Sequence, residues 1–298
     1  MLREKQSWGN WPSRRQKKNA SVILNDERPI SVLKAVELAS RGGLEHSRQE
    51  GQPLGTPYDP FAEQYRRSKE APFRQHVEQY TLRKLIGTLQ GQTALDLACG
   101  EGFYSRLLRA WGADTVVGVD LSPNMIDLAR RHESAQPLGI SYHVQDVRAL
   151  DLGQQFELVV AAFLFNHARN FDELREMARA VVRHLAPEGR LVAVISRGDQ
   201  PVSAYPKLTK YGFSKSTPGE LVEGAPITIT FHVDLGDFSV VNTCLYQSTM
   251  VRGLTAAGLS QQTWQQPVVS PEGVAQFGED YWDDFIEEPA LIFLEARR

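Results

Sequence analysis

The chain has 298 residues, of which 42% are hydrophobic and 23% charged, and its formal net charge is −3 at pH 7. This composition allows one large core with an added cap, and the small net charge excludes the strong positive field typical of nucleic-acid and anionic-membrane binders. No run approaches the roughly 18 apolar residues of a membrane span. The two cysteines, Cys99 and Cys244, are too few for a disulfide framework or a metal-ligand cluster, and they fit a reducing compartment. We therefore expect a cytoplasmic protein with a small-molecule partner and without nucleic acid, membrane or metal; the composition does not indicate an oligomeric state.

Residues 1–55 are predicted to form a basic tail, a short helix and a polar linker. Arg14, Arg15, Lys17 and Lys18 cluster in the tail, and Gly42 ends an apolar periodicity that begins near Pro29. A mobile tail is the simplest interpretation, and a nucleic-acid arm or an amphipathic targeting segment are the alternatives.

Residues 56–197 are predicted to form an α/β core. Two helical pieces separated by Pro72 come first, and strands then alternate with helices. The strands are expected at residues 94–97, 115–120, 140–144, 156–162 and 191–195, and the main crossover helices at residues 103–111, 123–129 and 171–185. This alternation favours a doubly wound parallel sheet with right-handed crossovers.

The pattern changes after Arg197. Residues 198–250 contain the alternating runs ITITFHV and FSVVNTCLY, which predict an inserted antiparallel cap. A helix over residues 251–257 and strands over residues 261–264 and 291–294 then complete the sheet within residues 251–298. The expected fold is a seven-stranded Rossmann-like sheet with an inserted β cap.

The stretch TALDLACGEGFYSR, residues 93–106, joins the first strand to its helix through a loop of small residues. Such a loop allows backbone N–H groups and the helix dipole to face an anionic group. Asp120 ends the next strand, 18 residues beyond Gly102, where its carboxylate can accept both hydroxyls of a ribose. Asp146 and the Val147 amide follow the third strand, at the position for an adenine edge. Together these features predict an adenosine-type ligand.

These residues resemble the class I S-adenosylmethionine-dependent methyltransferases. The family's acid-x-Gly-x-Gly-x-Gly loop is matched by Asp96, Ala98, Gly100 and Gly102, with Ala98 in place of the first glycine. The resemblance implies S-adenosylmethionine as cofactor and the following binding residues: Tyr65, Asp96, Ala98, Gly100, Gly102, Asp120, Leu121, Met125, Asp146, Val147, Ala162 and Phe163.

Four segments resemble a narrower group, the small bacterial secondary-metabolite methyltransferases of the toxoflavin N-methyltransferase type. They are PFRQHVEQYTL, DLACGEGFYSR, AAFLFNHA and GEDYWDDF. This resemblance implies N- or O-methylation of a heteroaromatic precursor by in-line displacement.

His167 is the candidate general base, because it follows the fourth strand close to the expected position of the methyl group. Candidate substrate contacts are Tyr104, Tyr205, Tyr211, His232, Tyr281 and Trp282. For each of these side chains, packing within the core or between cap and core is the alternative interpretation.

Three other functions remain open. A nicotinamide-binding domain shares the strand, the glycine turn and the ribose acid, but Asp96 faces the loop and Ser105 replaces the third fingerprint glycine. RNA or protein methylation is suggested only by the basic N-terminus. A regulatory protein that binds the cofactor without turnover is the remaining alternative, because Ala98 departs from the family signature and no base is certain.

Overall fold

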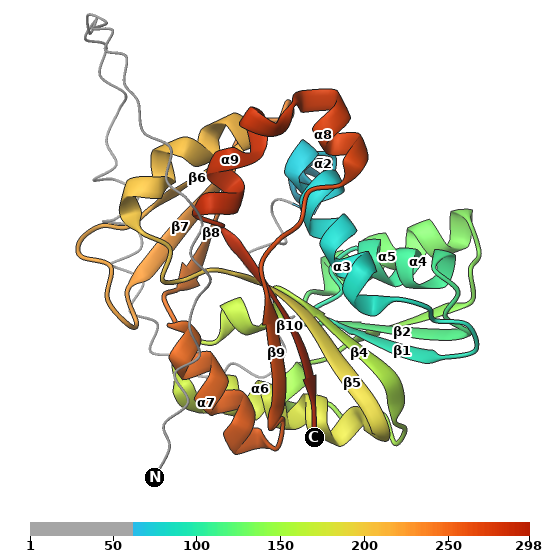
Figure 1. Ribbon diagram of the computed structural model, residues 1–298. Helices are drawn as coiled ribbons and strands as arrows, with labels where there is room; N and C mark the ends of the chain where they lie inside the picture. The colour runs from blue at the N-terminus through green and yellow to red at the C-terminus, as the bar shows by residue number, and fades with distance from the viewer. Residues whose placement is uncertain (1–61) are drawn as a thin grey trace, which may run out of the picture. The chain divides into compact units, whose positions relative to one another are not determined.

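A computed structural model describes residues 62–298 of the chain. The tail, short helix and linker predicted over residues 1–55 lie outside the described residues, as do residues 56–61 of the predicted core. The described residues form one seven-stranded sheet with helices on both faces, and a second sheet of three strands (Figure 1).

The elements alternate along the chain in the predicted manner. The α-helices are α2 (Ala62–Ser68), α3 (Tyr80–Ile86), α4 (Phe103–Ala110), α5 (Pro123–Ala135), α6 (Phe171–His184), α7 (Gln247–Ala257), α8 (Pro271–Phe277) and α9 (Glu279–Glu287). A π-helical segment, η2 (Arg74–Gln79), precedes α3, and three 3₁₀ segments are η3 (Val147–Ala149), η4 (Leu164–His167) and η5 (Val202–Tyr211). The strands are β1 (Thr93–Leu97), β2 (Thr115–Asp120), β3 (Ile140–Val144), β4 (Phe156–Ala162), β5 (Leu185–Ser196), β6 (Phe213–Ser216), β7 (Pro226–Phe231), β8 (Phe238–Thr243), β9 (Gln261–Gln265) and β10 (Leu291–Arg297).

The large sheet has the strand order β3-β2-β1-β4-β5-β10-β9, in which β10 runs antiparallel to both of its neighbours. Strands β1 to β5 are parallel, and the order reverses between β1 and β4. Open α/β sheets bind ligands at the carboxyl ends of the strands beside such a reversal. The predicted fold class is confirmed, including the two late strands.

Two apolar cores lie on the two faces of this sheet. Ala94 and Val116 pack with α3, α4 and α5 on one face, and their neighbours Leu95 and Val117 pack with α6 and α7 on the other. Alternate residues of a strand point to opposite faces, so these continuous apolar runs are buried on both sides. Burial on both faces makes the core sheet a rigid support for the loops at its carboxyl edge.

The inserted cap is the antiparallel sheet β6-β7-β8. Lys215 on β6 is buried, and its Nζ donates to Arg197 O at 3.1 Å and to Gln200 Oε1 at 3.0 Å, which ties the cap to the end of β5. Burial lowers the pKa of Lys215 to about 7. The cap also contacts η4, the segment that follows β4, so it lies at the carboxyl edge of the sheet.

Several boundaries differ from the predicted ones. Helix α7 begins at Gln247 rather than at residue 251, because its first turn is polar and gives no apolar periodicity. Helix α6 ends at His184, and the chain is already extended from Leu185 onward, so β5 begins six residues earlier than predicted.

The Tyr142 ring packs against two glycines, Gly102 and Gly118, beneath the loop that follows β1. A Cβ atom added at Gly102 would lie 2.8 Å from Tyr142 Cζ, and one added at Gly118 would lie 2.7 Å from Tyr142 Cδ1. The buried ring therefore cannot move away from one glycine without approaching the other.

We expect Gly102→Ala to lower the free energy of unfolding by about 2 to 5 kcal/mol, and the matched control Gly139→Ala by only about 1 to 2 kcal/mol. Both glycines have positive φ angles, +81° and +77°, but nothing lies within 4 Å of a Cβ added at Gly139. The comparison therefore separates steric overlap from backbone strain. Denaturant unfolding measures both values, and equal losses would show that Tyr142 does not constrain the loop.

Candidate functional site

The loop after β1 turns sharply into α4. Ala98, Gly100 and Gly102 all have positive φ angles, of 57°, 56° and 81°. Ala98 thus occupies a conformation that suits glycine better, which explains why the family signature places glycine at this position. The loop is fixed from the neighbouring strand, because the Gly100 amide donates to Asp120 Oδ2 at 2.8 Å.

Asp120 stands at the end of β2 with its carboxylate held in one orientation. Its Oδ1 accepts from the Ser122 amide at 2.9 Å, while Oδ2 accepts from Gly100. Ser122 in turn caps α5, since its hydroxyl accepts from the Met125 amide at 3.1 Å. A carboxylate has about four lone-pair sites on its two oxygens, so a group of this kind suits a vicinal diol.

A cavity of about 470 Å³ lies at the reversal point of the sheet. All of the predicted cofactor-binding residues line it except Asp96 and Gly102, and they do so together with His167, Arg148, Leu164, Arg169, Glu173 and Met177. The last five were not predicted, because neither their residue type nor their spacing in the sequence marks a binding site. We refer to this space as the cofactor cavity.

Asp96 lies beneath the loop rather than on the cavity wall. It is fully buried, and its Oδ2 accepts from Ser105 Oγ at 2.7 Å, while Oδ1 has no hydrogen-bond partner within residues 62–298. Burial raises the pKa of Asp96 to about 7. An unpaired, buried carboxylate oxygen beside the loop is an acceptor for a cationic group, so Asp96 together with Asp120 fits a ligand with an ammonium group and a ribose.

Asp146 and Val147 lie at the edge of the same cavity beyond β3. The Asp146 carboxylate caps η3 by accepting from the Arg148 amide at 2.9 Å, and it forms a 2.6 Å ion pair with the Arg148 guanidinium. The hydrogen bond with the Arg148 side chain lowers the pKa of Asp146. The carboxylate is therefore ionised and positioned at the cavity edge.

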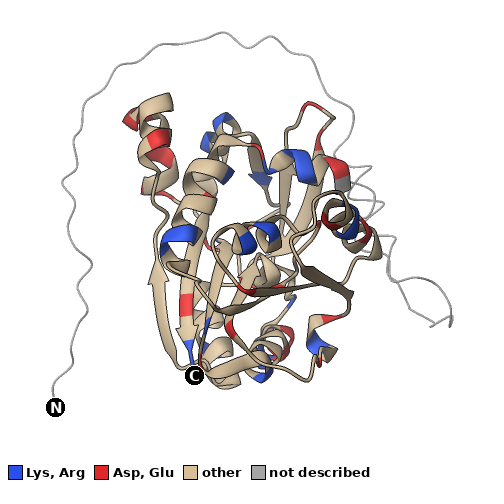
Figure 2. Cartoon of the chain, turned by 90° about the vertical axis from the view of Figure 1, so that its right-hand side faces the viewer, with Lys and Arg blue, Asp and Glu red and all other residues tan. Residues whose placement is uncertain are grey.

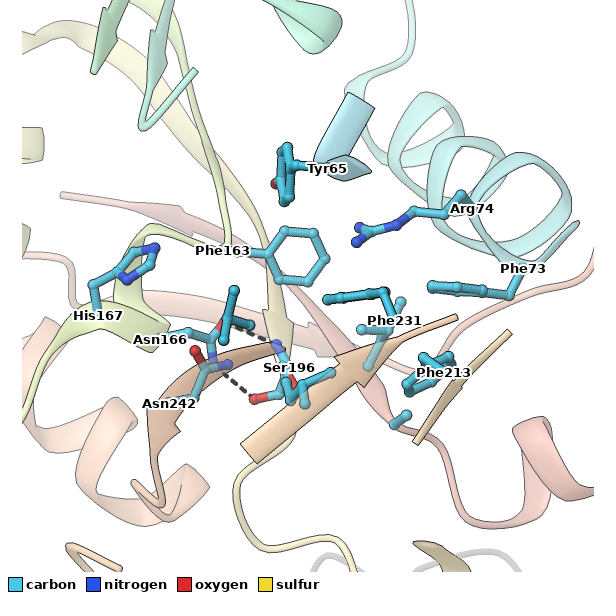
Figure 3. A pocket seen from close by; sticks show the side chains of 14 residues that line it. Tyr65, Phe73, Arg74, Phe163, Asn166, His167, Ser196, Phe213, Phe231 and Asn242 are labelled. Atoms are coloured by element: carbon cyan, nitrogen blue, oxygen red, sulfur yellow. Dashed lines mark hydrogen bonds between the residues drawn. The ribbon is translucent and has the colours of Figure 1, made fainter. Parts of the chain in front are cut away.

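A second, smaller cavity of about 40 Å³ lies between the segment before β1, η4 and the cap. Several aromatic rings line it, as Figure 3 shows, and its lining residues include Phe73, Arg74, Phe163, Asn166, Phe231 and Asn242. Tyr65, Phe163 and His167 line both cavities. This space, called here the acceptor cavity, holds a group of only a few heavy atoms unless one of the shared side chains rotates.

Phe163 is the residue between the two cavities. Its φ angle is +65°, in the left-handed region that aromatic residues rarely adopt, and its amide donates to Val194 O at 2.8 Å. The strand pairing thus holds a strained residue in place, as is frequent at binding sites.

Arg74, Glu78 and Tyr104 form a buried polar network on the wall of the acceptor cavity. Arg74 Nη1 and Glu78 Oε2 are 2.6 Å apart, with side-chain exposures of 3% and 0%. The Tyr104 hydroxyl donates to the other oxygen of Glu78. Tyr104 itself lines neither cavity, so the structure places this predicted substrate contact behind the wall.

His167 ends η4 and faces both cavities. The surrounding protein lowers the pKa of its imidazole, because desolvation disfavours the charged form. A neutral imidazole at this position is able to accept a proton.

The other predicted substrate contacts lie outside both cavities. The Tyr211 hydroxyl donates to Tyr281 O at 2.7 Å, and the Tyr211 ring stacks on Trp282 at a centroid distance of 5.8 Å, so these three residues pack η5 against α9. Tyr205 is buried in η5, and His232 pairs with Asp237 at 2.8 Å on the exposed edge of the cap. The contacts of Tyr211, Tyr281 and Trp282 are those of packing between two segments, which is the alternative that the sequence left open.

Residues 94–189 match a protein-family model described as "Methyltransferase domain". Two curated relatives align over stretches of similar length. The dTDP-4-amino-2,3,4,6-tetradeoxy-D-glucose N,N-dimethyltransferase of Saccharopolyspora spinosa is 38% identical over 107 residues, which cover 36% of this chain and 40% of the relative. The ribosomal protein L11 methyltransferase of Burkholderia vietnamiensis is 33% identical over 116 residues, covering 38% of this chain and 36% of the relative. The alignments thus span less than half the length of these relatives.

The fold extends further than the sequence similarity. A solved S-adenosylmethionine-dependent methyltransferase from Mesorhizobium loti superposes with a TM-score of 0.55 at 20% identity, covering 78% of this chain and all of that chain. Together with the family match, this shows that residues 94–189 are similar to a methyltransferase domain and that the fold of such enzymes extends over most of the chain.

No helix within residues 62–298 is long and apolar enough to cross a membrane. On the face presented in Figure 2, segments rich in Lys and Arg are interspersed with segments rich in Asp and Glu. Among residues 62–298, this view shows no one-sided basic stripe of the kind typical of nucleic-acid binding.

Proposed function

We propose that the whole chain is a cytoplasmic methyltransferase that transfers the methyl group of S-adenosylmethionine to a nitrogen or oxygen of a small, flat secondary-metabolite precursor, as in the toxoflavin-type group. The observation that carries this proposal is the pair of adjoining cavities, which share Tyr65, Phe163 and His167. One cavity has the donor and acceptor set for the cofactor, and the other is small and lined by apolar residues that include several aromatic rings. We further propose residues 56–197 and 251–298 as the cofactor-binding core and residues 198–250 as the substrate-binding cap.

In this proposal the cofactor-binding residues are those predicted from the sequence. Asp120 binds the ribose, Asp146 and Val147 bind the adenine, and Asp96 lies near the amino group of the methionine part. Gly100 and Gly102 keep the loop close to that part, while Leu121 and Met125 pack on the base. When bound, S-adenosylmethionine supplies a methyl group on a positively charged sulfur.

The protein's part in the reaction is mainly alignment. The shared wall of Tyr65, Phe163 and His167 holds the accepting atom opposite the methyl group and keeps water out, and such positioning can contribute about 7 to 11 kcal/mol in favourable cases. The face of the Tyr65 ring suits a cation, as does that of Phe163. His167 takes a proton from the accepting atom where that atom carries one.

We expect kcat/KM to decrease as the pH is lowered, with an apparent pKa below 6.5. In His167→Asn this acidic limb of the pH profile should disappear. A base acts only when it is deprotonated, and desolvation by the surrounding protein lowers the pKa of His167 from the ordinary value of 6.5, so the enzyme stays active to lower pH than a histidine of ordinary pKa would permit. The pH profile of both proteins, measured with the same substrate, tests this role. An unchanged limb in the variant would remove His167 as the base.

The proposed function is tested by two measurements on the full chain. Calorimetric titration with S-adenosylmethionine should show binding, and NAD should show none. Incubation with methyl-labelled S-adenosylmethionine and a small-molecule extract should then yield a labelled product. Binding without any labelled product would favour the regulatory alternative, and label on RNA or protein that is lost when residues 1–27 are removed would favour a macromolecular substrate.

A further inference from the structure

We propose that Arg74 determines substrate specificity, and that it selects a substrate with an anionic oxygen group, a carboxylate or an acidic hydroxyl. The inference rests on the proposed function, since it names the substrate class of the acceptor cavity. It begins from the one arginine on that cavity's wall.

One edge of the Arg74 guanidinium is occupied and the other is not. Nη1 contacts Glu78 Oε2 at 2.6 Å, whereas Nε is buried and has no hydrogen-bond partner within residues 62–298. Buried donors are nearly always paired in folded proteins, so an unpaired one on a cavity wall requires a specific explanation. An oxygen of a bound substrate supplies the missing acceptor once one of the side chains shared by the two cavities rotates, because Nε is closed to solvent in this structure.

Aromatic rings restrict the direction from which that acceptor comes. The guanidinium carbon lies 5.1 Å from the ring centroids of Phe73 and Phe163 and 5.2 Å from that of Phe231. In Figure 3 the guanidinium projects between these side chains. With rings packed around the group, the open approach is along its edge, in the plane that a carboxylate uses to pair with arginine.

The charge balance of the buried groups favours an anion. Lys69 is also buried, and its Nζ lies 4.8 Å from the Tyr65 ring centroid and 5.2 Å from that of Tyr104. Glu78 offsets only one of the two cations, Lys69 and Arg74. Asp96, the acid that interacts with Lys69, has its pKa raised to about 7 and offsets the second cation only in part. Since the cofactor's sulfonium adds positive charge, a cationic substrate is disfavoured and an anionic one is favoured.

Asn242 on the cap strand β8 offers a second polar contact in the same cavity. It is 8% exposed, and the structure gives its side chain no hydrogen bond within the described part of the chain. The neighbouring Asn166 is different, because its amide exchanges two hydrogen bonds with Ser196, at 2.8 and 2.9 Å. Asn242 is therefore available to a ligand and Asn166 is structural.

The size of the acceptor cavity is consistent with this assignment. About 40 Å³ accommodates a small polar group rather than a whole ring. The anionic group enters beside Arg74 and Asn242, and the rest of the substrate extends past Phe163 toward the cofactor cavity.

The test uses the full chain loaded with S-adenosylhomocysteine and three matched probes: 4-hydroxybenzoate, its methyl ester, and 4-hydroxybenzylamine. Calorimetry should show the acid binding at least about tenfold tighter than the ester or the amine, because a hydrogen bond to a charged group is stronger than a neutral one. Arg74→Lys keeps the positive charge but loses the planar edge of the guanidinium. In this variant the preference for the acid over the ester or the amine should fall to about threefold or less. Asn242→Leu should weaken the binding of the acid and leave the affinity for the ester unchanged.

Arg83→Lys on α3 is the matched control and should keep the full preference, since Arg83 lines neither cavity. An unchanged affinity of each variant for S-adenosylhomocysteine shows that it is folded. The proposal is overturned if the ester or amine binds as well as the acid, if none of the probes binds the loaded protein, or if the preference survives in Arg74→Lys. A protein that does not bind S-adenosylhomocysteine at all would instead contradict the proposed function.

Discussion

Asp120→Ala is expected to lower the affinity for S-adenosylhomocysteine by at least about 100-fold. Two ribose hydroxyls that donate to an ionised carboxylate contribute about 1.5 to 3 kcal/mol each, and a loss of 2.7 kcal/mol corresponds to a factor of about 100. The same carboxylate holds the Gly100 and Ser122 amides, at 2.8 and 2.9 Å. The substitution therefore removes the ribose contact and releases the loop. Calorimetric titration of the wild type and the variant measures the change.

Asp127→Ala is the matched control for this experiment. Asp127 lies on α5, only a few residues after Asp120 in the chain. Its side chain is 65% exposed, and its contact with Arg130 is long, at 3.9 Å. We expect the affinity of this variant to stay within about twofold of the wild type, as is usual for exposed surface pairs. If Asp120→Ala binds as tightly as Asp127→Ala, then β2 does not supply the ribose contact.

Glu78→Leu is expected to lower the free energy of unfolding by about 3 to 5 kcal/mol. The substitution leaves Arg74 as a buried cation without its counter-ion, and it removes the acceptor of the Tyr104 hydroxyl. For a folded unit of this size, each kcal/mol lowers Tm by roughly 2 to 4 °C, so the melting temperature should fall by about 6 to 20 °C. Thermal and denaturant unfolding provide the two measurements.

The origin of that loss is tested by a double variant and an exposed pair. Arg74→Met combined with Glu78→Leu removes both charges and should recover most of the stability, because apolar replacement of a buried ion pair is often neutral. Asp234→Ala breaks the pair between Arg67 and Asp234, which are 38% and 58% exposed, and should cost far less stability than Glu78→Leu. A double variant as unstable as Glu78→Leu alone would mean that packing, not the unpaired charge, dominates.

The sheet and most of the cofactor cavity follow from local sequence patterns. The strands Thr115–Asp120 and Ile140–Val144 have the predicted bounds. Thr115–Asp120 is a buried apolar run that ends in an acidic residue, whereas Ile140–Val144 lies at the edge of the sheet and its first three residues alternate between buried and exposed. Because the carboxyl ends of parallel strands meet at one edge, Asp120 and Asp146 line the same cavity without any further information.

The acceptor cavity was not predictable in the same way. Tyr211 and Trp282 satisfy an amphipathic pattern equally well whether they face a ligand or, as here, pack one helix on another, and periodicity does not distinguish the two. Arg74 was missed because a charged residue in a helical segment is usually exposed. The one available signal is its spacing of four residues from Glu78, the spacing of a helical ion pair, but only the tertiary fold buries that pair.

The shared wall of the two cavities has a thermodynamic consequence. Tyr65, Phe163 and His167 face both spaces, so a ligand that restricts these side chains on one side also restricts them for the ligand on the other side. Binding at the two sites is then coupled, and the coupling is reciprocal. The factor by which bound substrate raises the affinity for the cofactor must equal the factor by which bound cofactor raises the affinity for the substrate.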